Sequence, residues 1–94
     1  MNIVIHKQVL SLEENQVFVP GGEVRKLLDV QIQDEHACLW YEINTGAGPS
    51  FQTEVHIQVV GTGFYVPSNP FAYIATTQAG PYVWHWYGKR VFLP

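Results

Sequence analysis

Short runs of alternating apolar and polar residues, separated by turn-forming residues, dominate this sequence. Residues 51–59 place Phe, Thr, Val, Ile and Val on one side of an extended chain and Gln, Glu, His and Gln on the other. A period of two residues is that of a β-strand with one buried and one solvated face. Leu28, Val30 and Ile32 alternate in the same way with polar neighbours. The segment Ala37–Ile43 is apolar on both faces, which indicates a central or doubly covered strand.

Turn-forming residues divide the rest of the chain into segments of strand length. Clusters containing Gly, Pro, Asn or Asp lie at 20–22, 34–36, 45–49, 67–70 and 79–81. Further strands are predicted at Ile3–Val9, Gln16–Val19, Tyr73–Gln78 and Tyr82–Tyr87, with Val91–Leu93 as an extension of the last edge. Gly22–Leu28 is the best helical candidate, as a short helix or a loop that leads into a strand. We therefore expect an all-β fold, a small antiparallel sandwich or barrel of about seven or eight strands with little or no helix.

The length of the chain limits its organisation. Its 94 residues allow one domain, so residues 1–94 are expected to form a single β domain. Gly88–Pro94 carries Lys89 and Arg90 beside an apolar stretch. This segment is interpreted as either a loose tail or an edge strand of a neighbouring subunit.

Charged residues are scarce in this sequence. They form 14% of it, against about 25% in an average soluble domain. The formal net charge of −3 argues against a protein that coats DNA or RNA, because such proteins carry a basic excess. A single cysteine, Cys38, excludes an internal disulfide and fits a reducing compartment. No secretory signal or membrane-spanning apolar run is recognisable. We expect a cytoplasmic protein without membrane or bulk nucleic-acid contacts.

The residues that most often carry catalysis or metal binding form no recognisable motif. His6, His36, His56 and His85 are scattered, and no pair has the spacing of metal ligands. The serines lie in predicted loops, without a Gly-x-Ser-x-Gly pattern or an adjacent base. We predict no catalytic residue, no metal site and no cofactor, and we expect that the chain is not an enzyme.

Aromatic residues are concentrated after residue 40. A small core needs only part of this set, and the surplus suits a stacked nucleobase or a protein interface. In the predicted last strand, Trp84 and Trp86 share one face while His85 and Tyr87 share the other. The pair Lys89 and Arg90 comes directly after and would supply the cations that a phosphate needs.

The segment Gly61-Thr62-Gly63 comes after the clearest predicted strand. It lacks the Lys-Ser/Thr pair and the helix of a phosphate-binding loop. We favour a β-bulge or tight bend here, with a ligand-facing loop whose amides hold an anion as the alternative. The predicted ligand-binding residues are Gly61, Thr62, Gly63, His85, Trp86, Tyr87, Lys89 and Arg90. On this basis Trp86→Ala should weaken binding and spare the fold, whereas Trp40→Ala should lower stability, by about 3–5 kcal/mol if that side chain is buried.

Five segments carry a resemblance to known proteins: Leu28–Gln33, Cys38–Trp40, Gly61–Gly63, Tyr73–Gln78 and Val83–His85. Their order and spacing resemble the motifs VQVQ, CLW, GTG, YIGT-Q and VWH of a family of small phage and prophage proteins of unknown function. Ala75 stands where that family usually has Gly, and Gly88–Pro94 runs past its usual end. The resemblance implies a phage origin and supplies no biochemistry.

An origin in a phage genome favours a host-directed role. We expect a non-enzymatic accessory protein that counteracts a bacterial immune system in the host cytoplasm by sequestering a nucleotide-derived signalling molecule. The alternatives are an inhibitor that docks an aromatic face on a host defence protein, and a minor virion or assembly component. In each case we expect a homo-oligomer, at least a dimer.

Overall fold

The computed structural model describes residues 2–46, 48 and 51–93, and every regular element in these ranges is a β-strand. The strands are β1 (Ile3–Leu10), β2 (Asn15–Phe18), β3 (Glu23–Gln33), β4 (His36–Asn44), β5 (Thr53–Gly61), β6 (Ala72–Ala79) and β7 (Tyr82–Phe92). The all-β prediction is therefore confirmed. The short helix considered for Gly22–Leu28 is absent, because Glu23 already begins β3. Residues 47 and 49 of the predicted turn at 45–49, residue 94 of the predicted tail, and Ser50 lie outside the described ranges.

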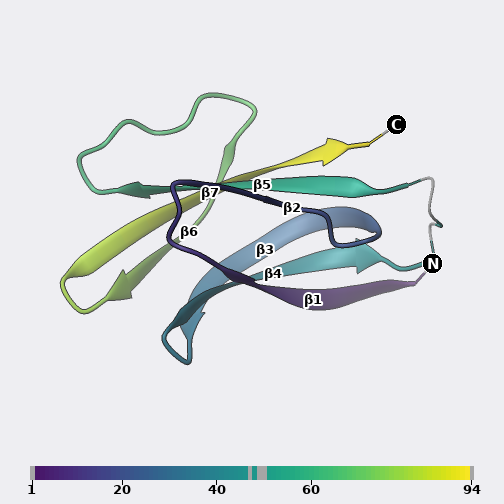
Figure 1. Cartoon of the computed structure of the whole chain (residues 1–94), viewed down its shortest axis with the longest axis horizontal. Helices are drawn as coiled ribbons and strands as arrows, with labels where there is room; N and C mark the ends of the chain where they lie inside the picture. Colours follow the sequence, from purple (N-terminus) through teal and green to yellow (C-terminus); the bar gives the residue numbers. More distant parts are fainter. Residues whose placement is uncertain (1, 47, 49–50, 94) are drawn as a thin grey trace.

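The strands form two sheets in a sandwich (Figure 1). Sheet A has the order β1-β4-β3, and sheet B has the order β2-β5-β7-β6. All pairings are antiparallel. Across the interface, β3 packs against β5, β6 and β7. The described chain contains no helix that is long and apolar enough to cross a membrane.

Two tight hairpins set the registers within the sheets. Asp34 and Glu35, which join β3 to β4, both have positive φ angles, of 50° and 68°. Two positive φ angles in a two-residue connection are the signature of a type I′ turn. Between β6 and β7, Gly80 has a φ of 60° and precedes Pro81, which matches a type II′ turn. Both turn types match the natural twist of antiparallel strands, so they start the β3–β4 and β6–β7 ladders in register.

The core lies between the sheets and has the predicted alternation. In the central strand β4, Ala37, Leu39, Tyr41 and Ile43 are buried against the partner sheet. Burial raises the pKa of Tyr41, so the core holds the neutral phenol. From sheet B, alternate residues of β5 such as Val55 and Ile57 fill the other half.

Trp40 does not lie in the core, so the burial required for a large stability loss in Trp40→Ala is not met. Trp40 is only half-buried and lies on the outer side of sheet A, where it lines a shallow hollow with Ile5 and Leu28. Its neighbours Leu39 and Tyr41 take the core positions. Because β4 is apolar on both faces, its sequence could not indicate which face is covered by the second sheet.

Bulges in β3 and β6 change the alternation predicted for these strands. The pairing of β3 with β4 shifts by one residue between Leu27 and Asp29. An extra residue reverses the side of the sheet to which the next residues of the strand point. Leu27 therefore packs against the core, and Leu28 lines the outer hollow instead. A second shift lies in β6 between Tyr73 and Ala75.

The C-terminal segment belongs to the chain's own sheet. Residues 88–92 continue β7 and pair with 53–57 of β5, so they form neither a loose tail nor a strand of another subunit. Gly88 lies where the sheets approach closely. A Cβ atom there would stand 2.6 Å from Leu27 Cδ1 and 2.8 Å from Ile74 Cδ1. The glycine therefore allows the side chains of β3 and β6 to meet above β7.

Candidate ligand-binding cleft

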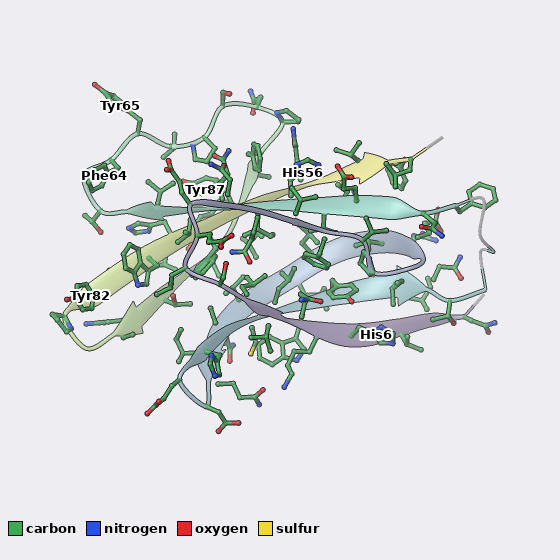
Figure 2. The ribbon with its side chains drawn as sticks, viewed as in Figure 1. His6, His56, Phe64, Tyr65, Tyr82 and Tyr87 are labelled. Carbon is green, nitrogen blue, oxygen red and sulfur yellow. The ribbon has the colours of Figure 1, made fainter. Side chains whose placement is uncertain are left out.

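Two predicted site segments, far apart in sequence, meet on the outer face of sheet B. Residues 61–63 and the side chains of His85 and Tyr87 line one open cleft of about 250 Å³, together with Val60, Phe64 and Val66. Figure 2 shows Phe64 and Tyr87 on this side of the ribbon. The prediction that His85 and Tyr87 share one face of their strand is confirmed. The antiparallel pairing of β5 and β7 explains the meeting, since Val60 pairs with His85.

The segment Gly61–Phe64 forms a β-turn, which is the tight bend that was one of the two favoured interpretations, and the pairing of β5 with β7 shows no β-bulge there. The Phe64 N–H donates to the Gly61 carbonyl at 3.2 Å, and Gly63 has a φ of 94°. This combination matches a type II turn, which requires glycine at its third position. At Gly61, a Cβ atom would meet the Phe64 and Trp84 rings at ordinary van der Waals distance, 3.4 Å from Phe64 Cδ2 and 3.6 Å from Trp84 Cζ3.

His85 is held by hydroxyl groups on both sides of its ring. Its Nε2 lies 2.9 Å from Thr62 Oγ1, and its Nδ1 lies 3.1 Å from Thr76 Oγ1. Thr76 Oγ1 is also 2.7 Å from the Tyr73 hydroxyl. A hydroxyl both donates and accepts, so this chain of hydrogen bonds satisfies either neutral tautomer of His85. Both ring nitrogens of His85 are thus hydrogen-bonded to threonine hydroxyls.

Beyond the residues that line the cleft, further aromatic rings and the predicted site residue Lys89 follow along β7. The rings of Tyr73 and Tyr87 meet edge to face, with centroids 5.7 Å apart. Lys89, two residues beyond Tyr87, places its Nζ 4.8 Å from the centroid of Phe71. Opposite Lys89 stands His56, which is bonded to Glu54 Oε1 at 2.5 Å. The outer face of sheet B therefore combines aromatic surface, hydroxyl groups and a cation.

The structure removes Trp86 and Arg90 from the predicted site. Trp86 has no exposed surface, and its Nε1 donates to Thr77 Oγ1 at 2.9 Å. It faces the core because the alternation of β7 turns it away from His85 and Tyr87. Arg90 also points inward, where its Nη1 donates to the carbonyls of Val24 and Arg25 in β3. Neither side chain reaches the cleft.

A larger hollow adjoins the cleft on the other side of Phe64. Its volume is about 620 Å³, and its walls include Leu12, Tyr65, Pro67 and Trp84. The two hollows share Val60, Gly61, Phe64 and Val66, so they lie side by side around one loop. Phe64 is 76% exposed and Tyr65 98% exposed, and both rings stand at the margin of the molecule in Figure 2.

Sequence reasoning missed Thr76 and Tyr73, which complete the network around His85. Thr76 was predictable in principle. A two-residue Gly80-Pro81 turn pairs Ala79 with Tyr82, and the same ladder then pairs Thr76 with His85. Tyr73 was not predictable in this way, because the bulge at Ile74 shifts the ladder by one residue before Tyr73 pairs with Tyr87.

The fold and the cleft together define a small two-sheet β protein with an aromatic and hydroxyl-lined surface on one sheet. Within the described ranges, no group of three or more His, Cys, Asp or Glu side chains is arranged to hold a metal ion. The chain belongs to a family described as a domain of unknown function (DUF7352), whose sequence model matches residues 1–92. No curated protein and no solved structure matches the chain.

Proposed function

We propose that this protein binds a nucleotide-like small molecule, without turning it over, in the cleft on the outer face of sheet B. The observation that carries the proposal is the meeting of the 61–64 turn with His85 and Tyr87 in one cleft. Aromatic walls with a few polar groups are typical of small-ligand sites. Aromatic rings also stack on nucleobases, at about 1–3 kcal/mol per base.

The spacing along β7 supports a ligand with a planar ring and an anionic group. Tyr87 and Lys89 lie on the same side of the strand, about 7 Å apart along it. A base over Tyr87 would leave its phosphate near the Lys89 ammonium, and charge-assisted hydrogen bonds to phosphate are strong. The Thr62 and Thr76 hydroxyls, held by His85, would bind polar edges of the ring.

The motif resemblance supports a biological setting for this binding. A phage or prophage origin favours a role in the host cytoplasm, where capture of a nucleotide-derived immune messenger would silence a defence system.

Calorimetry against a panel of cyclic and linear nucleotides tests the proposal. We expect one class of ligand to bind wild type, and Lys89→Met to weaken that binding at least tenfold, the effect of about 1.4 kcal/mol. The matched control is Lys26→Met, on the opposite sheet, which should bind as wild type does. Ligand recovered from the complex after denaturation should be unaltered. The absence of binding by every nucleotide at high micromolar concentration would contradict the proposal.

Exposed aromatic rings at one end of the sandwich favour a second function, docking on a host protein. Tyr82 is 62% exposed and stacks on Trp84 with centroids 6.1 Å apart and planes at 11°. With Phe64 and Tyr65 it forms a surface of the kind found at interface hot spots. In this case Tyr65→Ser should abolish capture of a single stoichiometric host protein, while Lys89→Met should not. Unchanged capture by the Tyr65→Ser variant would exclude this surface.

A further inference from the structure

In the part of the chain that the structure describes, four edge strands bound the two sheets, and only one of them lacks protection against pairing with another chain. Natural edges are commonly short, bulged, charged or covered. The edge strand β2 has four residues. The edge strand β3 carries two register shifts, and β6 carries one. In contrast, β1 runs for eight residues in unbroken register with β4, and Lys7 is its only charged residue.

Exposed apolar side chains lie on both sides of the sheet in β1, around a polar centre formed by His6, Lys7 and Gln8. On the outer side, Ile5 is 60% and Val9 51% exposed. On the side that faces the second sheet, Val4 is 42% exposed. Figure 1 shows β1 at the margin of the molecule. Apolar side chains on both sides of a strand are typical of covered strands rather than of a solvated edge.

We propose that β1 pairs antiparallel with β1 of a second copy of this chain, so that two three-stranded sheets A become one six-stranded sheet. This inference does not depend on the proposed ligand. The free backbone edge of each strand supplies the donors and acceptors for the other. A two-fold axis makes the contact closed and self-complementary.

The side chains of β1 select the register of this pairing. When the two-fold axis passes beside His6, Ile3 stands opposite Val9 of the second copy, and Ile5 opposite its Lys7. The two His6 side chains then face each other across the axis, whereas the two Lys7 side chains do not. A pairing centred on Lys7 would instead place two lysines in direct opposition, which is destabilising.

Lys7 has the reach to strengthen the register centred on His6. In the single chain its Nζ already crosses β4 to bond Gln33 Oε1 in β3, at 2.7 Å. In the dimer, the same reach in the opposite direction would cross Ile5 of the second copy and approach Glu42, which pairs with Ile5. The pairing thus joins apolar contacts with one ion pair on each side of the axis.

Sedimentation of the wild-type chain and three variants tests the proposal. We expect the wild type to have the mass of two chains at micromolar concentration. Ile5→Lys should reduce this mass to one chain, because the new lysine faces Lys7 of the second copy. Adding Lys7→Glu to Ile5→Lys should restore the mass of two chains, since opposite charges then face each other. Val17→Lys, at a 53% exposed position of β2, is the matched control and should remain a dimer.

Hydrogen exchange provides an independent measure on the wild-type chain. Alternate amides of β1 point toward the free edge and should become protected as protein concentration rises, while the amides bonded to β4 stay protected throughout. A wild type with the mass of one chain, or an Ile5→Lys variant that keeps the mass of two, overturns the proposal. Failure of the double variant to regain the dimer overturns the pairing about His6.

Discussion

The two sides of β7 differ in burial and in chemistry. On the inner side, Trp86 is fully buried and bonded to Thr77, and Gly88 leaves room for side chains of the neighbouring strands. On the outer side, His85 and Tyr87 border an open cleft. Adjacent aromatic residues thus serve stability and surface chemistry separately. The side of the strand to which each aromatic side chain points decides its role, and the residue type alone does not reveal that side.

The largest effect should come from Trp86→Ala. Removing a fully buried tryptophan side chain creates a cavity and leaves Thr77 without its donor, so we expect a loss of about 3–5 kcal/mol in the free energy of unfolding. Chemical denaturation followed by circular dichroism measures this loss. Trp86→Phe, which keeps most of the apolar volume, should lose less. If Trp86→Ala left the free energy of unfolding unchanged, the inner side of β7 would not be more important for stability than the outer side.

A smaller loss in the free energy of unfolding is expected from Gly88→Ala, which adds an atom to the inner side of β7 instead of removing a side chain from it. Gly88→Ala would bring a Cβ atom to 2.6 Å from Leu27 Cδ1 and 3.1 Å from Ile57 Cδ1. These side-chain ends must shift within a packed core, and overpacking of this kind costs about 1–3 kcal/mol. The same denaturation assay applies. Gly21→Ala tests backbone strain instead of crowding between side chains. A Cβ atom at Gly21 would meet nothing within 4 Å, but the φ angle of 86° is one that alanine rarely adopts.

Substitution of Arg90, on the inner side of β7, tests whether this residue contributes to stability rather than to ligand binding. Its guanidinium bonds two carbonyls at a register shift in β3, and so ties sheet B to sheet A. Because the side chain is exposed, water can replace part of these bonds. We therefore expect Arg90→Ala to lower the free energy of unfolding by about 1 kcal/mol. Nucleotide binding by this variant should equal that of wild type, and a selective loss of binding would return Arg90 to the ligand site.

Alternation explains how much of this fold was predictable from the sequence. The segment 51–59 was recognisable because a strand with a period of two has few other ways to bury its apolar residues. The segment 37–43 was recognisable because a short apolar run between turns is typical of a covered strand. The bulges at Leu28 and Ile74 were not recognisable, since an extra residue leaves no mark in composition. The facing of Trp40 was not predictable for a related reason. Both faces of β4 are apolar, and only the position of the second sheet distinguishes them.

The candidate cleft was predictable in part. The glycines at 61 and 63 and the shared face of His85 and Tyr87 were accessible from local rules for turns and strands. Trp86 and Arg90 were assigned to it because they neighbour these residues in sequence. In a strand, however, sequence neighbours point to opposite sides. Tertiary contacts with Thr77 and β3 then hold them in the core and at the sheet interface.

The smallest effect on stability should come from the outer side, with His85→Ala. The imidazole bonds two exposed threonine hydroxyls, and water can solvate these hydroxyls once the ring is removed. We therefore expect a change of less than about 1 kcal/mol in the free energy of unfolding. Thr62 and Thr76 would lose their fixed orientation, so any nucleotide bound by wild type should bind this variant more weakly in calorimetry. If His85→Ala lost as much stability as Trp86→Ala, His85 would be a structural residue. If it bound nucleotide more weakly without that loss, the outer side of β7 would serve binding and the inner side stability.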